Sequence, residues 1–326
     1  MCNLRINCFN DTYYFCLKRN DFVIYSSIYE SVGNTPLIRV FKDIHPNILA
    51  KLEYLNPGGS VKDRSALYMI EQAERDGILQ PGGTIVDASS GNQGIATAMI
   101  GAAKGYKVII VISDKSSQEK IKALRAFGAQ VVTVPPTLFL EDPNSYHSKA
   151  MEIHKNIPNS FMPNQYFNTA NAMGHYHSLG PEIWRQTEGK ITHFISAVGT
   201  GGNVSGAGKY LKEQNPNVQV IAVDSNNSFR ATKGNPKPYK IEGMGVDFDS
   251  PVLNYSVIDE FYEVADEPGL AMLKELAHHE GILVGPSSGA VAYAGKMYAQ
   301  KLPKDAIAVL VLGDSGRAYL SKDFYS

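Results

Sequence analysis

The stretch Thr84-Ile85-Val86-Asp87-Ala88-Ser89-Ser90-Gly91-Asn92-Gln93-Gly94 decides the fold class. Its first five residues are β-branched or apolar apart from Asp87, which is typical of a short buried strand. The six residues that follow are small or polar and predict a loop, and the run 95–104 predicts a helix that ends at Gly105. A strand, a glycine loop and a helix in this order predict one βα unit of a parallel sheet.

The same alternation recurs on both sides of this unit. Further strands are predicted over residues 108–112, 130–134, 193–198, 218–223 and 306–312, and helices over 65–76, 118–127, 146–156, 204–214, 267–280 and from the loop 285–289 to about 300. We therefore expect an α/β protein with two doubly wound αβ domains and mainly parallel sheets. The predicted domains are 25–170 and 171–326, after an N-terminal extension over 1–24 to which we assign no function.

Composition excludes several classes of function. The 326 residues carry a formal net charge of -1, which gives no indication of a nucleic-acid or membrane partner. The three cysteines all lie in the first sixteen residues, so they form no disulfide framework, and with His45 as the first histidine they have no nearby partner for a metal site. No apolar run reaches the roughly 18–20 residues that span a bilayer, and no secretory h-region precedes the first domain. We expect a cytoplasmic protein without a metal.

One lysine upstream of this unit is a candidate catalytic amine. The octet Pro57-Gly58-Gly59-Ser60-Val61-Lys62-Asp63-Arg64 places it between a glycine turn and a helix, and Ser60 with Asp63 predicts a capping box. Lys62 then lies in the first turn, where the helix dipole disfavours an ammonium group. A lysine that loses its proton is suited to forming an imine. Taken alone, a lysine at such a position is far more often a solvated surface residue, so its role depends on the rest of the chain.

A second glycine loop, Gly199-Thr200-Gly201-Gly202-Asn203, follows a predicted strand and opens a helix. Successive backbone N–H groups at such a helix start can bind a phosphate. A dinucleotide site is an alternative, because Asp224 ends the next strand where a ribose-binding acid would lie. The pattern G-x-G-x-x-G fails, however, since Val204 stands at the third glycine position. A single phosphate group is the better fit.

These stretches resemble one family. The resemblance rests on five motifs in register: Ser31-Val32-Gly33-Asn34-Thr35-Pro36-Leu37, the octet around Lys62, Ser89–Gly94, Gly199–Asn203 and Gly285-Pro286-Ser287-Ser288-Gly289. From about residue 27 to the end, the chain resembles the cysteine synthase and cystathionine β-synthase family of fold-type II (tryptophan synthase β-like) pyridoxal-phosphate enzymes.

The resemblance implies a role for each motif. Lys62 would carry pyridoxal 5′-phosphate and act as the base, Asn92 would bond the 3′-oxygen of the cofactor, and Ser287 would face its pyridine nitrogen. The cofactor's phosphate would be held by Gly199, Thr200, Gly201, Gly202 and Asn203. The substrate's α-carboxylate would be held by Ser89, Ser90, Gln93 and Gln165. Family analogy also suggests a homodimer.

The implied reaction is β-replacement on L-serine or an O-activated L-serine by a thiol or sulfide. Several stretches, among them Glu242-Gly243-Met244-Gly245 and 314–321, look closer to cystathionine β-synthase, which condenses serine with homocysteine. Cysteine synthase, using O-acetylserine and sulfide, is the alternative. A serine or threonine dehydratase and a non-catalytic binding protein on the same fold stay open. Gln93 and Asn203 depart from the family's usual threonines, and Val246 stands where animal enzymes carry a tyrosine, which puts the substrate preference in doubt.

Overall fold

The βα unit around residue 88 forms as the sequence predicts. In the computed structural model, which describes residues 6–8, 11–13, 23–89, 91–137 and 142–325, β5 (Thr84–Ala88) is buried along its whole length. Helix α2 (Asn92–Lys104) follows the loop and ends at Gly105, whose φ of 77° is left-handed. That backbone conformation favours glycine, which explains why the helix ends there.

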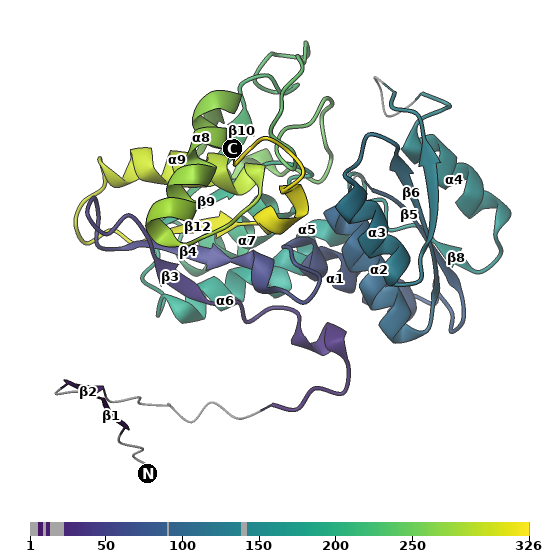
Figure 1. Cartoon of the computed structure of the whole chain (residues 1–326), viewed down its shortest axis with the longest axis horizontal. Helices are drawn as coiled ribbons and strands as arrows, with labels where there is room; N and C mark the ends of the chain where they lie inside the picture. The colour runs from purple at the N-terminus through teal and green to yellow at the C-terminus, as the bar shows by residue number, and fades with distance from the viewer. Residues whose placement is uncertain (1–5, 9–10, 14–22, 90, 138–141, 326) are drawn as a thin grey trace.

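A smaller sheet is built around this unit. Its four strands are all parallel, and their order is β7 (Gln130–Val134), β6 (Lys107–Ser113), β5 and β8 (Ser160–Phe161). Helices α2 and α3 (Gln118–Ala126) bury Leu124 and Ile110 on one face, and α4 (Tyr146–Asn156) packs on the other. These helices lie around the strands on the right of Figure 1.

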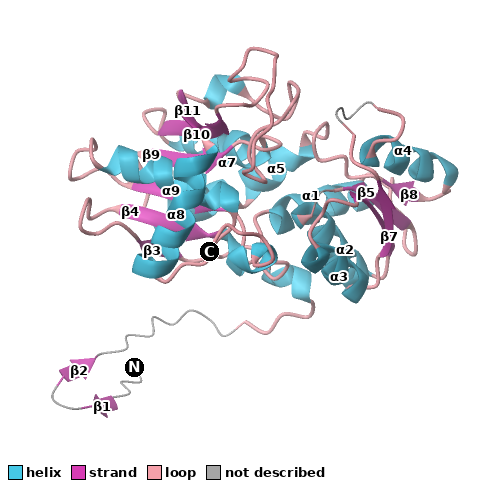
Figure 2. Ribbon diagram, turned by 45° about the horizontal axis from the view of Figure 1, so that its top comes forward, coloured by secondary structure: helices cyan, strands magenta, loops and turns pink. Residues whose placement is uncertain are grey.

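A larger sheet contains six strands. Their order is β11 (Glu260–Val264), β10 (Gln219–Ser225), β9 (His193–Ala197), β12 (Ala308–Leu312), β4 (Ile48–Leu52) and β3 (Leu37–Arg39). Only β3 runs antiparallel to its neighbour. Helices α8 (Asp266–Glu275) and α9 (Pro286–Ala299) pack on one face, where Figure 2 shows them lying across the strands, and α6 (Leu179–Gln186) and α7 (Gly202–Gln214) pack on the other. The predicted α/β fold with mainly parallel sheets is confirmed.

Sheet membership does not follow the predicted division at residue 170. Strands β3 and β4 lie within the range 25–170, yet β4 pairs with β12 and completes the larger sheet. The buried side chains of β4, Ile48, Ala50 and Leu52, join the core beneath α8 and α9. Strand β4 thereby covers the edge of the apolar strand β12. A division of the chain by sequence order alone does not predict this pairing.

Helix α5 (Ala170–His177) connects the two halves. It packs against α1 (Lys62–Arg75) and α7, and glycines permit the close approach. A Cβ atom on Gly206 of α7 would lie 1.9 Å from the Ala172 carbonyl oxygen, and one on Gly174 would lie 3.1 Å from the Arg64 carbonyl oxygen. The helix that begins with Lys62 and the helix that follows the second glycine loop are therefore held at fixed positions.

The predicted extension lies partly outside the described residues. Within it, β1 (Ile6–Cys8) pairs antiparallel with β2 (Asp11–Tyr13). The predicted helix 267–280 is α8 followed by a π-helical turn over Leu276–Glu280. Over the described part of the chain, no helix is both long and apolar enough to cross a membrane.

Candidate active site

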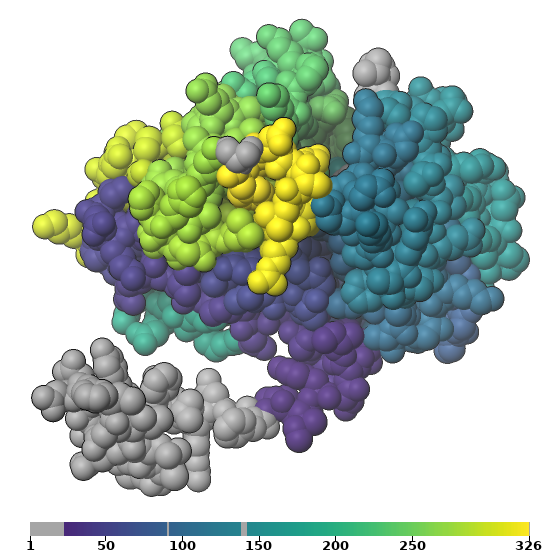
Figure 3. Space-filling view, in the orientation of Figure 1, coloured from purple at the N-terminus to yellow at the C-terminus, as the bar shows by residue number. Residues whose placement is uncertain are grey.

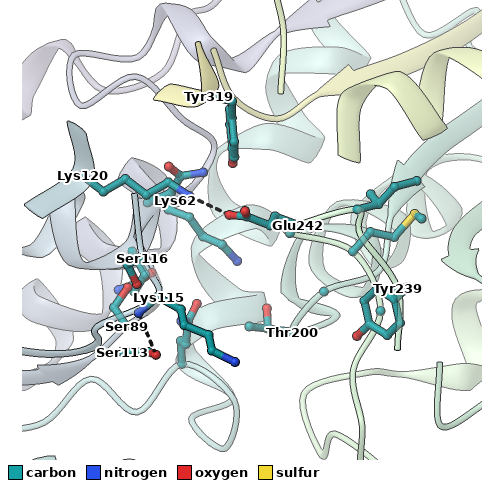
Figure 4. Close-up of a pocket in the computed structure, with 18 of the residues that line it drawn as sticks. Lys62, Ser89, Ser113, Lys115, Ser116, Lys120, Thr200, Tyr239, Glu242 and Tyr319 are labelled. Atoms are coloured by element: carbon teal, nitrogen blue, oxygen red, sulfur yellow. Dashed lines mark hydrogen bonds and ion pairs between the residues drawn. The ribbon is translucent and has the colours of Figure 1, made fainter. Parts of the chain in front are cut away.

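A cavity of about 440 Å³ lies between the two sheets, at the carboxyl ends of β5, β6 and β9. Ligands of open α/β sheets bind at this end of the strands. Of the predicted site residues, its walls contain Lys62, Ser89, Asn92, Gln93, Gln165, Gly199 and Thr200. Figure 4 shows Lys62, Ser89 and Thr200 around this cavity. Ser90 lies outside the described residues.

Lys62 is the first residue of α1, as predicted, and its side chain is partly buried at the cavity wall. Burial lowers the pKa of its amine from the ordinary 10.5 to about 8, and the Asp314 and Asp87 carboxylates only partly oppose this shift. A desolvated ammonium loses its proton more easily, so Lys62 has the property that an imine-forming lysine needs. The sequence indicated the helix dipole as a cause of a lowered pKa, and the structure adds burial.

The predicted capping box is wrong in its geometry. The Asp63 carboxylate accepts the Gly58 N–H instead of the Ser60 N–H, and the Ser60 hydroxyl oxygen accepts the Lys62 N–H at 3.2 Å. The carboxylate lies so close to the turn that a Cβ atom on Gly58 would come within 2.4 Å of it. The Gly58 turn is thus closed by a side chain of the helix, which fixes the backbone just before Lys62.

Two of the predicted carboxylate-binding residues, Ser89 and Gln93, lie at the start of α2, and Gln165 lines the same cavity. The Ser89 hydroxyl oxygen accepts the Gly91 N–H at 3.1 Å and the Gly94 N–H at 2.8 Å, which leaves its hydrogen to donate elsewhere. Gln93 and Gln165 are both nearly fully buried, and the Gln165 side-chain oxygen has no hydrogen-bond partner among the described residues. Hydrogen-bonding groups next to a helix N-terminus are suited to holding a carboxylate.

The predicted phosphate loop has the expected form at its centre. Gly201 has a φ of 89° and directly precedes α7, and a Cβ atom on it would lie 2.8 Å from Leu253. A Cβ atom on Gly199 would lie 2.9 Å from the Gly243 carbonyl oxygen. Both positions therefore need glycine. At the start of α7, the Gly202 N–H donates to the Thr200 hydroxyl oxygen and the Val204 N–H to the Asn203 side-chain oxygen, so a phosphate here would also be held by the Thr200 hydroxyl.

Several predicted residues lie outside the cavity wall. The Asn203 amide donates to the Ser196 hydroxyl at 2.8 Å, so its side chain is used within the larger sheet. Ser287, in the first turn of α9, lies behind Gly243: its hydroxyl oxygen would be 3.3 Å from a Cβ atom there. Asp224 accepts bonds from Arg230 and Ser228 and is not free for a ribose.

A charged cluster at the cavity mouth was not assigned a role from the sequence. Lys120 of α3 pairs with Glu242 at 3.0 Å and lies 4.4 Å from the centre of the Tyr319 ring. Lys322 pairs with the same carboxylate. Burial alone would raise the pKa of Glu242, but the two ammonium groups outweigh it and lower that pKa. Figure 3 shows the C-terminal segment, in yellow, against the surface that includes α3.

Asp314 lies beneath this cluster and orients a predicted site residue. Its carboxylate accepts the Asn92 amide at 2.7 Å and the Tyr319 hydroxyl at 2.6 Å. Burial raises the pKa of Asp314. The motifs 242–245 and 314–321 resemble the family in sequence, but only folding brings them to Asn92 and Lys120.

The chain matches the family model "Pyridoxal-phosphate dependent enzyme" over residues 28–314. The chain belongs to this family. It is 41% identical to a cysteine synthase of Staphylococcus aureus, over 92% of this chain and 97% of the relative. It is 40% identical to a cystathionine beta-synthase of Apis mellifera, over 98% of this chain but only 66% of the relative.

Solved structures give the same result. The O-acetylserine-dependent cystathionine beta-synthase of Helicobacter pylori superimposes with a TM-score of 0.86 at 36% identity, covering 93% of this chain and 100% of that one. A hydrogen sulfide-producing enzyme of Fusobacterium nucleatum has a TM-score of 0.85 at 37% identity, covering 91% and 99%. The predicted family and the predicted cofactor, pyridoxal phosphate, are confirmed: the chain is a pyridoxal-phosphate-dependent enzyme of sulfur amino-acid metabolism.

The residues present fit this cofactor. Lys62 offers an amine whose pKa is lowered to about 8, and it lines the same cavity as Gly199 and Thr200, which lie just before α7. The glycines at 199 and 201 leave space that side chains would fill. An aldehyde and a phosphate on one small molecule match these two features.

Proposed function

We propose that this enzyme replaces the β-substituent of L-serine or an O-activated L-serine with a sulfur nucleophile. One observation carries the proposal: the Lys62 amine, the phosphate loop at Thr200 and the carboxylate loop at Ser89 and Gln165 line one cavity. An amino acid whose carboxylate is held by the α2 loop would then be placed next to Lys62.

The residues then have distinct tasks. The Ser89 hydroxyl and the buried amides of Gln93 and Gln165 orient the substrate carboxylate. Lys62, with a pKa of about 8, is matched to taking a proton from Cα near neutral pH. The bound cofactor supplies the electron withdrawal that makes this proton acidic. Ser287 offers a hydroxyl group to the pyridine nitrogen of the cofactor. Unlike a carboxylate, a hydroxyl does not keep that nitrogen protonated.

The first candidate reaction joins serine and homocysteine, as in cystathionine β-synthase. Among the described residues, the cavity is lined by Lys115, Lys120, Lys240 and Lys322 besides Lys62, and by one carboxylate, that of Glu242. This excess of positive charge suits a thiol that carries its own carboxylate. The second candidate, O-acetylserine with sulfide, is supported by the 41% identity to a cysteine synthase.

A matrix of substrates and nucleophiles tests the proposal. Purified enzyme is assayed with serine or O-acetylserine, each with homocysteine, with sulfide or with no thiol, and Lys62→Ala serves as the control. We expect cystathionine formation, with turnover and visible cofactor absorbance both lost in Lys62→Ala. Turnover with sulfide alone would favour cysteine synthase. Release of pyruvate without any thiol would indicate a dehydratase, and a colourless inactive protein would indicate a binding protein.

We also propose, from the family resemblance alone, a homodimer in the cytoplasm. Light scattering on the purified protein tests the oligomeric state. A mass of a single chain would contradict it.

A further inference from the structure

Asn171, at the second position of α5, makes two hydrogen bonds from one nitrogen. Its side chain is fully buried, and its amide nitrogen donates to the Gln165 carbonyl oxygen at 2.8 Å and to the Thr200 hydroxyl oxygen at 3.0 Å. A carbonyl oxygen can only accept, so the atom between these two groups is the nitrogen and not the amide oxygen. Both amide hydrogens are therefore committed, and the orientation of the amide is fixed.

The bond from Asn171 determines where the Thr200 hydrogen points. The Thr200 hydroxyl oxygen also accepts the Gly202 N–H at 3.3 Å, so both of its lone pairs are occupied. Its own hydrogen must then go to a third group. Thr200 lines the cavity, and Figure 4 shows it there facing the space around Lys62. A hydroxyl that already accepts two bonds is polarised and becomes a stronger donor.

We propose that Asn171 is a positioning residue that aims the Thr200 proton at the phosphate of the cofactor. This inference rests on the proposed function, which places that phosphate at the loop before α7. Asn171 itself does not line the cavity and acts only through Thr200.

A second buried side chain supports the same arrangement. The Ser250 hydroxyl donates to the Thr200 carbonyl oxygen at 2.9 Å and lies 3.2 Å from the Tyr166 carbonyl oxygen. Asn171 and Ser250 therefore connect the segment 165–166 to Thr200 from two sides. Because Gln165 belongs to the proposed carboxylate site, the phosphate loop and the substrate loop are joined by buried hydrogen bonds.

Close packing keeps Asn171 in place. A Cβ atom on Gly202 would lie 2.1 Å from its amide oxygen, which has no hydrogen-bond partner among the described residues. The amide thus fits against the glycine backbone at the start of α7 and cannot shift toward it. A residue of the same shape but different hydrogen-bonding capacity is the sharpest probe of this site.

The substitution Asn171→Asp keeps the shape and removes the two-hydrogen donor. A carboxylate accepts the Thr200 hydrogen and turns it away from the cavity; a protonated acid has only one hydrogen for two acceptors. Cofactor-free full-length protein is titrated with pyridoxal 5′-phosphate and with pyridoxal, which lacks the phosphate, and followed by visible absorbance. We expect the Kd for the phosphate form to rise about tenfold or more, as loss of one hydrogen bond to a charged group implies, and the Kd for pyridoxal to change less than about twofold.

Matched variants distinguish an error in the proposed phosphate site from an error in the role of Asn171. Thr200→Val removes the hydroxyl and Thr200→Ser keeps it, so only the first should weaken the phosphate form. Asn254→Asp makes the same change at an exposed cap whose side-chain oxygen only accepts, and should alter neither Kd. If Thr200→Val has no effect, the proposed phosphate site is wrong. If Thr200→Val weakens binding and Asn171→Asp does not, the role of Asn171 is wrong.

A purely structural role gives a different result. It would weaken pyridoxal and pyridoxal 5′-phosphate equally, and that outcome overturns the proposal. Should Asn171→Asp fail to fold, Asn171→Ala takes its place. This change frees one lone pair of the Thr200 hydroxyl oxygen. We expect the Kd for pyridoxal 5′-phosphate to rise several-fold, with a smaller change in the Kd for pyridoxal. The phosphorus resonance of the bound cofactor should also shift in either variant.

Discussion

Replacing Lys62 by methionine should stabilise the cofactor-free protein, by an amount that falls as the pH rises. The pKa of Lys62 is about 8 in the folded protein against an ordinary value of 10.5. The unfolded chain therefore binds more protons between these pH values, and the stability of the wild type rises across that window. Below it, the buried ammonium destabilises the folded state by about 3 kcal/mol.

The pH dependence gives the magnitude of the expected gain. By the same relation, the shifted pKa of Lys62 lowers the free energy of unfolding of the wild type by about 3 kcal/mol at about pH 6.5 and by about 1 kcal/mol at about pH 9.5. Lys62→Met removes the titrating group and keeps most of the apolar side chain. The gain over the wild type should accordingly shrink by about 2 kcal/mol between the two pH values.

Urea denaturation of both cofactor-free proteins at the two pH values measures this difference. Lys115→Met is the matched control, because it makes the same change at an exposed lysine of the same cavity. A gain for Lys62→Met that is equal at both pH values, or larger at the higher one, would refute the argument. The amine would then not be the group that burial perturbs.

Two further substitutions test the packing around the site. Glu182→Gln should cost about 3 kcal/mol or more in urea denaturation, because Lys51 and Arg64 are buried and both pair with this carboxylate; a loss below about 1 kcal/mol would contradict that. Gly206→Ala should cost about 3 kcal/mol or prevent folding, since its new methyl group would lie 1.9 Å from a carbonyl oxygen of α5. Gly208→Ala, whose new methyl group would lie 3.1 Å from the Val220 side chain and 3.7 Å from that of Val257, should cost clearly less in urea denaturation.

Most strands and helices were predictable because their signals are local. The run that becomes β5 and the glycine that ends α2 are read from neighbouring residues, and the structure has both at the predicted positions. The antiparallel edge was not predictable. Strand β3 and its partner β4 join a sheet whose other strands come from residues 193–312, and no local pattern encodes a pairing across that distance.

The sequence by itself determined the family, the cofactor and the lysine that we propose carries it, because each motif is contiguous and needs glycine at fixed positions. Only the tertiary structure decided how those motifs act together. Burial, which comes from packing and not from residue order, lowers the pKa of Lys62. The amide of Asn171 fixes the Thr200 hydroxyl from another helix, and Asp314 holds Asn92 from the far end of the chain. Desolvation and hydrogen-bond direction depend on which groups surround an atom in space, and residue order does not specify them.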